Sequence, residues 1–209
     1  DRFANERPRW ELAGAELVND VRGHELAKLR MLNGAHSALA YLGLAAGYQF
    51  VHEAIADPAI RSLVERLMLD EAGPTLSPAS GPAPAAYAAR LLQRFENDRL
   101  PHSLRQIAMD GTQKLPQRWF ATLAERASAG RSSPAILEAL AAWICHVRGA
   151  GVPVEDPLEP ALRVAWSRAG ADGIVGSLFG NGGLLSQGWT AGAEEQAILT
   201  KRGRARCGP

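Results

Sequence analysis

The chain has 209 residues, of which 46% are hydrophobic and 22% are charged, and its formal net charge at pH 7 is +1. This composition is ordinary for a globular protein, and the near-neutral charge creates no overall field that would favour nucleic acid. No apolar run reaches the length of a membrane span, so we expect neither a nucleic acid nor a membrane as a partner.

The two cysteines lie far apart in the sequence. Cys145 belongs to an apolar helical run, and Cys207 follows the basic stretch KRGRAR in what we expect to be a solvated C-terminal tail. This usage predicts neither a disulfide framework nor a zinc site, and the default compartment is the reducing cytoplasm. The N-terminal residues are charged, contain no signal-peptide core and begin without Met. We therefore expect a fragment or a processed product.

The stretch from Glu25 to Gly47 predicts a long and mostly apolar helix. Three polar residues, Lys28, Asn33 and His36, interrupt its leucines and alanines. At 3.6 residues per turn, Asn33 and His36 share a face, and Lys28 lies roughly 80° around the helix. The long lysine side chain can lean across that angle.

Two interpretations of these three residues stay open from the pattern alone. In the first, Lys28 keeps its ammonium group in water above an apolar stem and His36 is a core histidine with its hydrogen bonds satisfied. In the second, the three polar groups share a ligand with several hydroxyls or move a proton, because buried polar groups need partners.

Further helices follow in chain order. Asp57-Pro58 predicts an N-cap followed by proline in the first turn, and Ser103 with Gln106 has the form of a capping box. The segment from Gly73 to Pro84 is rich in Pro, Gly and Ser and predicts a surface loop. The helices expected after the first span residues 49–56, 58–72, 85–96, 103–110, 116–130, 134–149, 157–170 and 190–203.

A second polar cluster, residues 110–118, crowds what we expect to be a turn between two helices. Loops on a helical scaffold often carry function, and a plain surface turn explains the same pattern. The glycine-rich GNGG at residues 180–183 follows no strand and lacks the lysine of a phosphate-binding loop, so it predicts a turn or helix end. No strand alternation or dinucleotide fingerprint is present, and the expected fold class is all-α.

These residues resemble a known family. KLRMLNGAHSALAYLG, with Lys28, Asn33 and His36, is similar to the lysine–asparagine–histidine signature of the mannitol dehydrogenase family. These polyol-specific long-chain dehydrogenases include mannitol 2-dehydrogenase and fructuronate reductase. RFEND, a following histidine and QIAMDGTQKLPQR resemble a second family stretch in the right order. FANERPRWELAGAELVNDV looks like the entry into its C-terminal domain, and the resemblance covers about residues 1–170.

The resemblance implies a two-domain oxidoreductase of carbohydrate metabolism. Residues 1–209 would be its helical C-terminal domain, of the 6-phosphogluconate-dehydrogenase-like type, which supplies most of the substrate site. NAD or NADP would be bound mainly by an N-terminal Rossmann domain absent from this sequence and supplied in cis or in trans. The expected small-molecule partner is a polyol or sugar acid, and no cofactor-binding residue is assigned within this chain.

The resemblance also assigns roles to residues. Lys28 would be the general base; because an ordinary lysine has a pKa of about 10.4, burial or a nearby cation must lower it, and we expect the apolar helix to bury it. Asn33 would stabilise the developing alkoxide, and His36 would bind a substrate hydroxyl. The expected substrate-binding residues are Lys114, Gln106, His102 and Asp110.

Two positions depart from the family pattern and leave the substrate open. Asp98 stands where the family usually has proline, and Gln106 stands where some mannitol enzymes carry an arginine. A metal is not implied, because a lysine base and an amide oxyanion hole need none. The alternative to a catalytic domain is a non-catalytic helical module that retains the motif without the cofactor domain.

Overall fold

The computed structural model describes residues 5–77 and 81–207. Within these residues the regular structure is helical, apart from a single bridge between Phe50 and Ser103, so the predicted all-α class is confirmed. Its α-helices are α1 Arg22–Ala27, α2 Gly34–Ala45, α3 Val51–Ala56, α4 Pro58–Arg66, α5 Pro84–Phe95, α6 Leu104–Ala108, α7 Gly111–Leu115, α8 Ala121–Ser128, α9 Pro134–His146, α10 Glu159–Phe179 and α11 Ala193–Cys207. Shorter or wider turns are η1 Trp10–Ala13, η2 Lys28–Asn33, η3 Leu67–Ala72, η4 Gly73–Thr75 and η5 Pro116–Phe120.

The long helix predicted at residues 25–47 is present and begins slightly earlier. It runs from α1 through η2 into α2 without leaving helical backbone angles. The regular geometry expected inside it was wrong, because η2 is π-helical. In a π turn the hydrogen bond joins residues five apart, so Lys28 and Asn33 lie one wide turn apart rather than offset around a regular helix.

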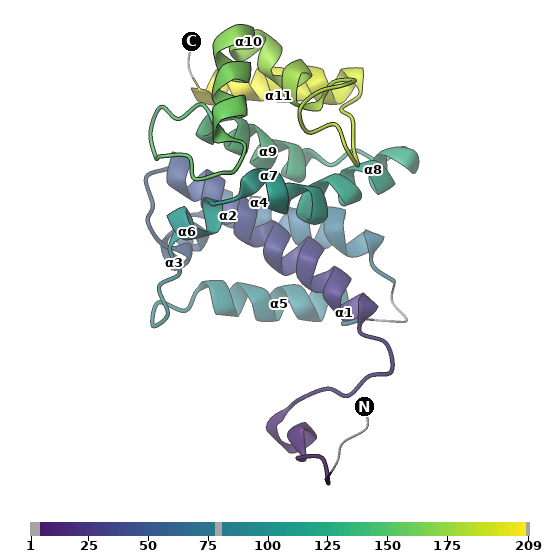
Figure 1. The fold of residues 1–209 in the computed structure, drawn as a ribbon. Helices are drawn as coiled ribbons and strands as arrows, with labels where there is room; N and C mark the ends of the chain where they lie inside the picture. Colours follow the sequence, from purple (N-terminus) through teal and green to yellow (C-terminus); the bar gives the residue numbers. More distant parts are fainter. Residues whose placement is uncertain (1–4, 78–80, 208–209) are drawn as a thin grey trace.

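The helix α2 crosses the body of the molecule and lies between other helices on most of its faces (Figure 1). It packs against α9, α6, α3 and α4, and nine of its twelve residues are buried. The core around it is rich in large side chains that are almost fully buried: Trp119, Trp143, Tyr41, Phe120, Phe179, Met31 and Leu39. Since burial of apolar surface is the main favourable term in folding, α2 and the residues around it anchor the fold.

Side chains cap the N-termini of several helices, as the sequence predicted. Asp57 Oδ1 accepts hydrogen bonds from the backbone N–H groups of Ala59 and Ile60 at 2.8 and 3.1 Å. Ser103 Oγ accepts from Gln106 N at 3.4 Å, which is one half of the predicted capping box. A cap that the sequence pattern did not predict comes from the buried Glu71, whose carboxylate accepts from the first two N–H groups of α9 after Pro134.

Several boundaries differ from the prediction. Pro116 does not begin a helix but lies inside the continuous helical run from α7 through η5 to α8. The predicted loop at residues 73–84 begins with the short turn η4, and residues 78–80 of it lie outside the described residues. The helix predicted to end at Gly170 does leave helical geometry there, with φ of 60°, and the further helical segment that continues α10 to Phe179 was not predicted. The predicted GNGG turn follows it, with Gly182 at φ of 72°.

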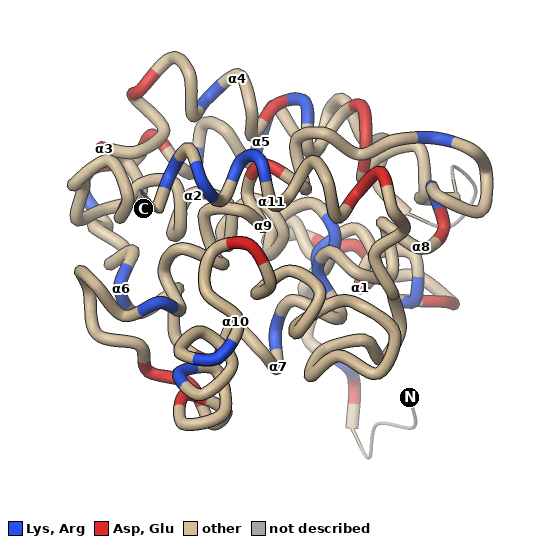
Figure 2. The backbone as a smooth tube through the Cα atoms, turned by 90° about the horizontal axis from the view of Figure 1, so that it is seen from above, with Lys and Arg blue, Asp and Glu red and all other residues tan. Residues whose placement is uncertain are grey.

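The C-terminal prediction was wrong. The basic stretch at residues 201–206 is not a solvated tail but part of α11, which packs against α9 and α10. Figure 2 shows its basic residues as a blue run that leads to the C-terminus. Cys145 of α9 and Cys207 of α11 form a disulfide, contrary to the expected free cysteines. Helical docking of α11 brings the two thiols together, which sequence spacing does not reveal. Among the described residues, no helix has both the length and the apolarity needed to span a membrane.

Candidate functional site

Asn33 and His36 extend from the junction of η2 and α2, where both are partly buried. Lys28 begins the same π turn and is exposed. The expectation that the apolar helix buries this lysine was therefore wrong, because its side chain is exposed to solvent. π turns interrupt α-helices mostly at functional positions, and this one holds two of the three predicted catalytic residues.

His36 meets residues from a distant part of the chain. Its ring lies 4.9 Å from Phe95 and 6.2 Å from His102, measured between ring centroids. Burial, together with the nearby charges of His102, Arg118 and Arg94, lowers the pKa of His36 from 6.5 to about 4. At neutral pH, His36 is therefore an uncharged imidazole, which donates one hydrogen bond and accepts another.

Two of the predicted residues, His36 and His102, are thus brought together. The backbone holds His102 in place, because its carbonyl accepts a hydrogen bond from Val51 N at 3.0 Å next to the Phe50–Ser103 bridge. His102 itself is exposed. The pair forms one edge of a polar face that combines both sequence motifs.

Arg118 joins the two motifs directly. Its Nη1 donates to Ser37 Oγ at 2.8 Å and to the Asn33 backbone oxygen at 3.4 Å. Burial lowers the pKa of this guanidinium, which still keeps its charge in proteins. Sequence analysis did not assign Arg118 a role. The available signal was its position four residues after Lys114 in a helix-forming run, which places both cations on one helix face.

Lys114 lies on α7, in a segment that was expected to be a turn and is instead helical after Asp110. Its Nζ donates to the Met109 oxygen at 2.5 Å and to the Ile107 oxygen at 3.5 Å, and lies 3.9 Å from Asp110 Oδ2. Burial and the nearby Arg118 charge lower the pKa of Lys114, against the opposing effect of Asp110. Lys114 thus sits in the same electropositive environment as Arg118.

Asp110 precedes α7 in the left-handed conformation with φ of 56°, which is unusual for a residue other than glycine. Its backbone N–H donates to the Glu155 oxygen at 2.9 Å, and its carboxylate faces Lys114. Gln106 is exposed on α6. Within the described part of the chain, the Gln106 and Lys28 side chains make no hydrogen bond to the other predicted site residues.

Together these residues form a polar face with neutral and charged hydrogen-bond donors. It combines a neutral imidazole, a partly buried amide at Asn33 and two partly buried cations, Lys114 and Arg118, while Lys28 is exposed at the start of the same π turn as Asn33. Each of these groups can donate hydrogen bonds, which is the chemistry that a neutral or anionic molecule with several hydroxyls requires of its site. Among the described residues, no cluster of three or more His, Cys, Asp or Glu side chains is placed to hold a metal ion.

Comparisons with known proteins agree with the resemblance seen in the sequence. Residues 20–176 match the family model for the mannitol dehydrogenase C-terminal domain. The chain is 37% identical to D-mannonate oxidoreductase of Escherichia coli over 213 residues, covering 99% of this chain and 44% of that protein. It is 36% identical to a mannitol dehydrogenase of Saccharomyces cerevisiae over 178 residues, covering 82% and 36% respectively.

A solved structure has the same fold. It is the Pseudomonas fluorescens mannitol 2-dehydrogenase in a ternary complex with NAD and D-mannitol, with a TM-score of 0.81 and 28% identity. The match covers 100% of this chain and 42% of that one. The chain therefore spans less than half the length of these relatives.

Proposed function

Because the chain belongs to the mannitol dehydrogenase family, as its C-terminal domain, we propose that it is the substrate-binding and catalytic half of an NAD(P)-dependent dehydrogenase. The reaction would interconvert a polyol or sugar acid and its ketose, of the mannitol/fructose or mannonate/fructuronate type. Support comes from relatives that are named as D-mannonate oxidoreductase and mannitol dehydrogenase.

One observation carries the proposal beyond family membership. The two separate sequence motifs meet on one face, where His36 approaches His102 and Arg118 binds Ser37 beside Asn33. A non-catalytic helical core has no need for a neutral histidine, an amide and two cations on one surface, since partial burial of each polar group costs free energy.

In the proposed mechanism, Lys28 takes the proton from the reacting hydroxyl during alcohol oxidation and returns it during ketone reduction. Asn33 donates a hydrogen bond to the oxygen as negative charge develops on it. His36, uncharged at neutral pH, holds a neighbouring hydroxyl without adding a charge. Lys114 and Arg118 would hold the far end of the substrate, where a sugar acid carries its carboxylate.

The nicotinamide cofactor, when bound, accepts or supplies the hydride. The described residues form helices and turns and contain no strand–glycine turn–helix unit that would hold a pyrophosphate. We therefore assign cofactor binding to a Rossmann domain outside this sequence. Since Lys28 is exposed here, we also assign the covering of its ammonium group to that domain and the bound cofactor.

A fusion enzyme tests the proposal. The chain is joined to the part of the E. coli D-mannonate oxidoreductase that it does not span, and reduction of NAD or NADP is measured with mannonate, mannitol and sorbitol. Turnover of one substrate is expected, and Lys28→Ala should lower kcat by about 10²- to 10⁴-fold with cofactor binding retained. The matched control is Lys201→Ala, which alters another exposed lysine on α11.

Retained turnover in the Lys28→Ala fusion would remove Lys28 from the role of base. A folded fusion that binds cofactor but turns over none of these substrates would favour the non-catalytic module. We propose the cytoplasm as the compartment, and there the Cys145–Cys207 disulfide of the structure would be reduced. Alkylation of thiols in freshly lysed cells tests that placement, because both cysteines should be labelled in a reducing compartment.

A further inference from the structure

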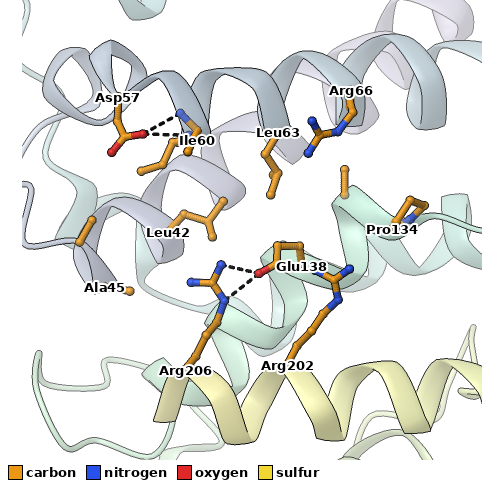
Figure 3. Close-up of a pocket in the computed structure, with 13 residues that line it drawn as sticks. Leu42, Ala45, Asp57, Ile60, Leu63, Arg66, Pro134, Glu138, Arg202 and Arg206 are labelled. Atoms are coloured by element: carbon orange, nitrogen blue, oxygen red, sulfur yellow. Dashed lines mark hydrogen bonds and ion pairs between the residues drawn. The ribbon is translucent and has the colours of Figure 1, made fainter. Parts of the chain in front are cut away.

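A cavity of about 350 Å³ lies between α2, α4, α9 and α11, away from the proposed substrate face. Figure 3 shows Arg66 extending from α4, and Arg202 and Arg206 extending from α11 toward Glu138 of α9. The volume falls within the range of small-molecule pockets. Apart from Asp57, apolar side chains form the rest of its wall, including Leu42, Ala45, Ile60, Leu63 and Pro134.

The arginines of this cavity outnumber the carboxylates that are free to neutralise them. Glu138 receives ion pairs from both Arg202 and Arg206, and Arg206 Nε lies 2.9 Å from Glu138 Oε1. One carboxylate thus serves two guanidinium groups. A guanidinium has five N–H donors, so a single shared carboxylate leaves donor capacity unused.

The second carboxylate in the wall is already engaged. Asp57 caps α4 through Oδ1, and its Oδ2 accepts a hydrogen bond from Tyr48 at 3.2 Å. Arg66 donates to Ser62 Oγ at 2.9 Å on its own helix, and no ion pair to Arg66 occurs among the described residues. The cavity wall therefore has three guanidinium groups against two carboxylates, Asp57 and Glu138, and a net charge of +1.

We propose that this cavity binds a small anion, a carboxylate or phosphate on a compact carbon body, at a second site that goes beyond the proposed dehydrogenase role. Guanidinium groups match the planar and tetrahedral geometry of these anions with paired hydrogen bonds. The apolar wall would pack against the carbon body of the ligand.

The site is distinct from the proposed substrate face. Ala45 lies nine residues beyond His36 on α2, which is about 14 Å along a helix at 1.5 Å per residue. The wall contributed by α11 is fixed by the Cys145–Cys207 disulfide, which follows Arg206 directly in the sequence. Opening the disulfide should therefore weaken binding here and leave the substrate face unaffected.

The experiment measures the thermal stability of the full 209-residue chain with inorganic phosphate, with succinate, and with NaCl at matched ionic strength. Binding at ten times Kd should raise Tm by about 3–5 °C over NaCl. Comparing the Tm shift with phosphate to the shift with succinate distinguishes a phosphate site from a carboxylate site. Arg66→Gln is the main variant, because this side chain is exposed and its change should not disturb folding. It should lower the affinity at least about tenfold.

Arg202→Gln is the second variant and should have the same effect. Lys28→Gln on the substrate face and Arg163→Gln, an exposed residue of α10 that pairs with Glu159, are the matched controls and should keep the full shift. Equal shifts with NaCl and with both anions, or shifts that survive Arg66→Gln undiminished, would overturn the proposal. If Lys28→Gln alone abolished the Tm shift, the anion would bind at the substrate face, and that result would also overturn the proposal.

Discussion

His36 of α2 lies 6.2 Å from His102, ring centroid to ring centroid, although the two residues belong to separate sequence motifs. Their approach depends on the α2–α6 packing and on the bridge that fixes Ser103 beside Phe50. It places the partly buried, neutral imidazole of His36 next to the exposed ring of His102, and the charge of Arg118 acts on His36.

The stability of the chain should depend on pH through His36. Its folded-state pKa of about 4 lies below the ordinary value of 6.5, so the unfolded chain binds this proton first as pH falls. Stability is therefore fully present above pH 6.5 and decreases as pH falls toward 4, by about 3 kcal/mol at most. Urea unfolding of the wild type and of His36→Gln at several pH values measures this loss of unfolding free energy.

The decisive quantity is the difference between the two curves, since burial also lowers the pKa of His146 and raises that of Glu71. These groups contribute equally to both proteins and cancel in the subtraction. A difference in unfolding free energy that stays constant between pH 4 and 7 would contradict the assignment to His36.

Arg118 and Ser37 should be energetically coupled. Arg118→Ala removes the bond to Ser37 Oγ at 2.8 Å, and a hydrogen bond to a charged group typically contributes about 1.5–3 kcal/mol. In a double-mutant cycle with Ser37→Ala, the coupling energy should exceed about 0.5 kcal/mol. Additive losses within error would show that the two side chains do not interact in solution.

Reduction of the Cys145–Cys207 disulfide should destabilise the docking of α11. The bond closes a loop with a sequence separation of 62 residues, and its loss should cost about 2–4 kcal/mol. Unfolding is compared with and without dithiothreitol. The control is the double variant Cys145→Ser/Cys207→Ser, whose unfolding free energy should equal that of the reduced wild type and should not change with dithiothreitol. Identical unfolding curves for oxidised and reduced wild type would refute the prediction.

Gly111, at the start of α7, should not accept a side chain. A Cβ there would lie 2.5 Å from Trp143 Nε1 and 2.7 Å from Tyr41 Oη, so Gly111→Ala should cost about 1–3 kcal/mol through overpacking. Gly203→Ala in α11 is the matched control, because a Cβ there meets no atom within 4 Å. Comparable Tm values for the two variants would argue against the close packing.

The isolated chain should not oxidise mannitol or reduce fructuronate with NAD(H). The described residues include no nucleotide-binding fold, and the hydride transfer needs one. Spectrophotometric assay of the purified chain measures this directly. Turnover that persists through further purification and disappears with Lys28→Ala would show that the chain binds the cofactor itself.

Much of the fold follows from local patterns. The long helix around Asn33 and His36 is predicted by its apolar run, and the caps at Asp57 and Ser103 by residues whose side chains bond to nearby N–H groups. These features depend on neighbours in sequence. The π turn at Lys28–Asn33 does not, since no residue type marks it, and it arises where the helix is packed against η5 and η3.

The candidate site, like the fold, has some features that the sequence predicts and others that only the structure shows. Lys28, Asn33, His36 and Lys114 were named from the sequence through their resemblance to a family signature, and their chemical roles are still predictions. The exposure of Lys28, the neutral state of His36 and the bridge from Arg118 depend on burial and on contacts between distant segments. No pattern within one helix carries that information.

By itself, the sequence determined the helical class, most helix positions and the family, because periodicity, caps and motifs are local properties of the chain. Only the tertiary structure decided that Cys145 bonds Cys207, that the basic C-terminal stretch is a packed helix, and that two motifs share one face. Each of these depends on which helix faces are buried against one another, and that is set by the packing of the whole core.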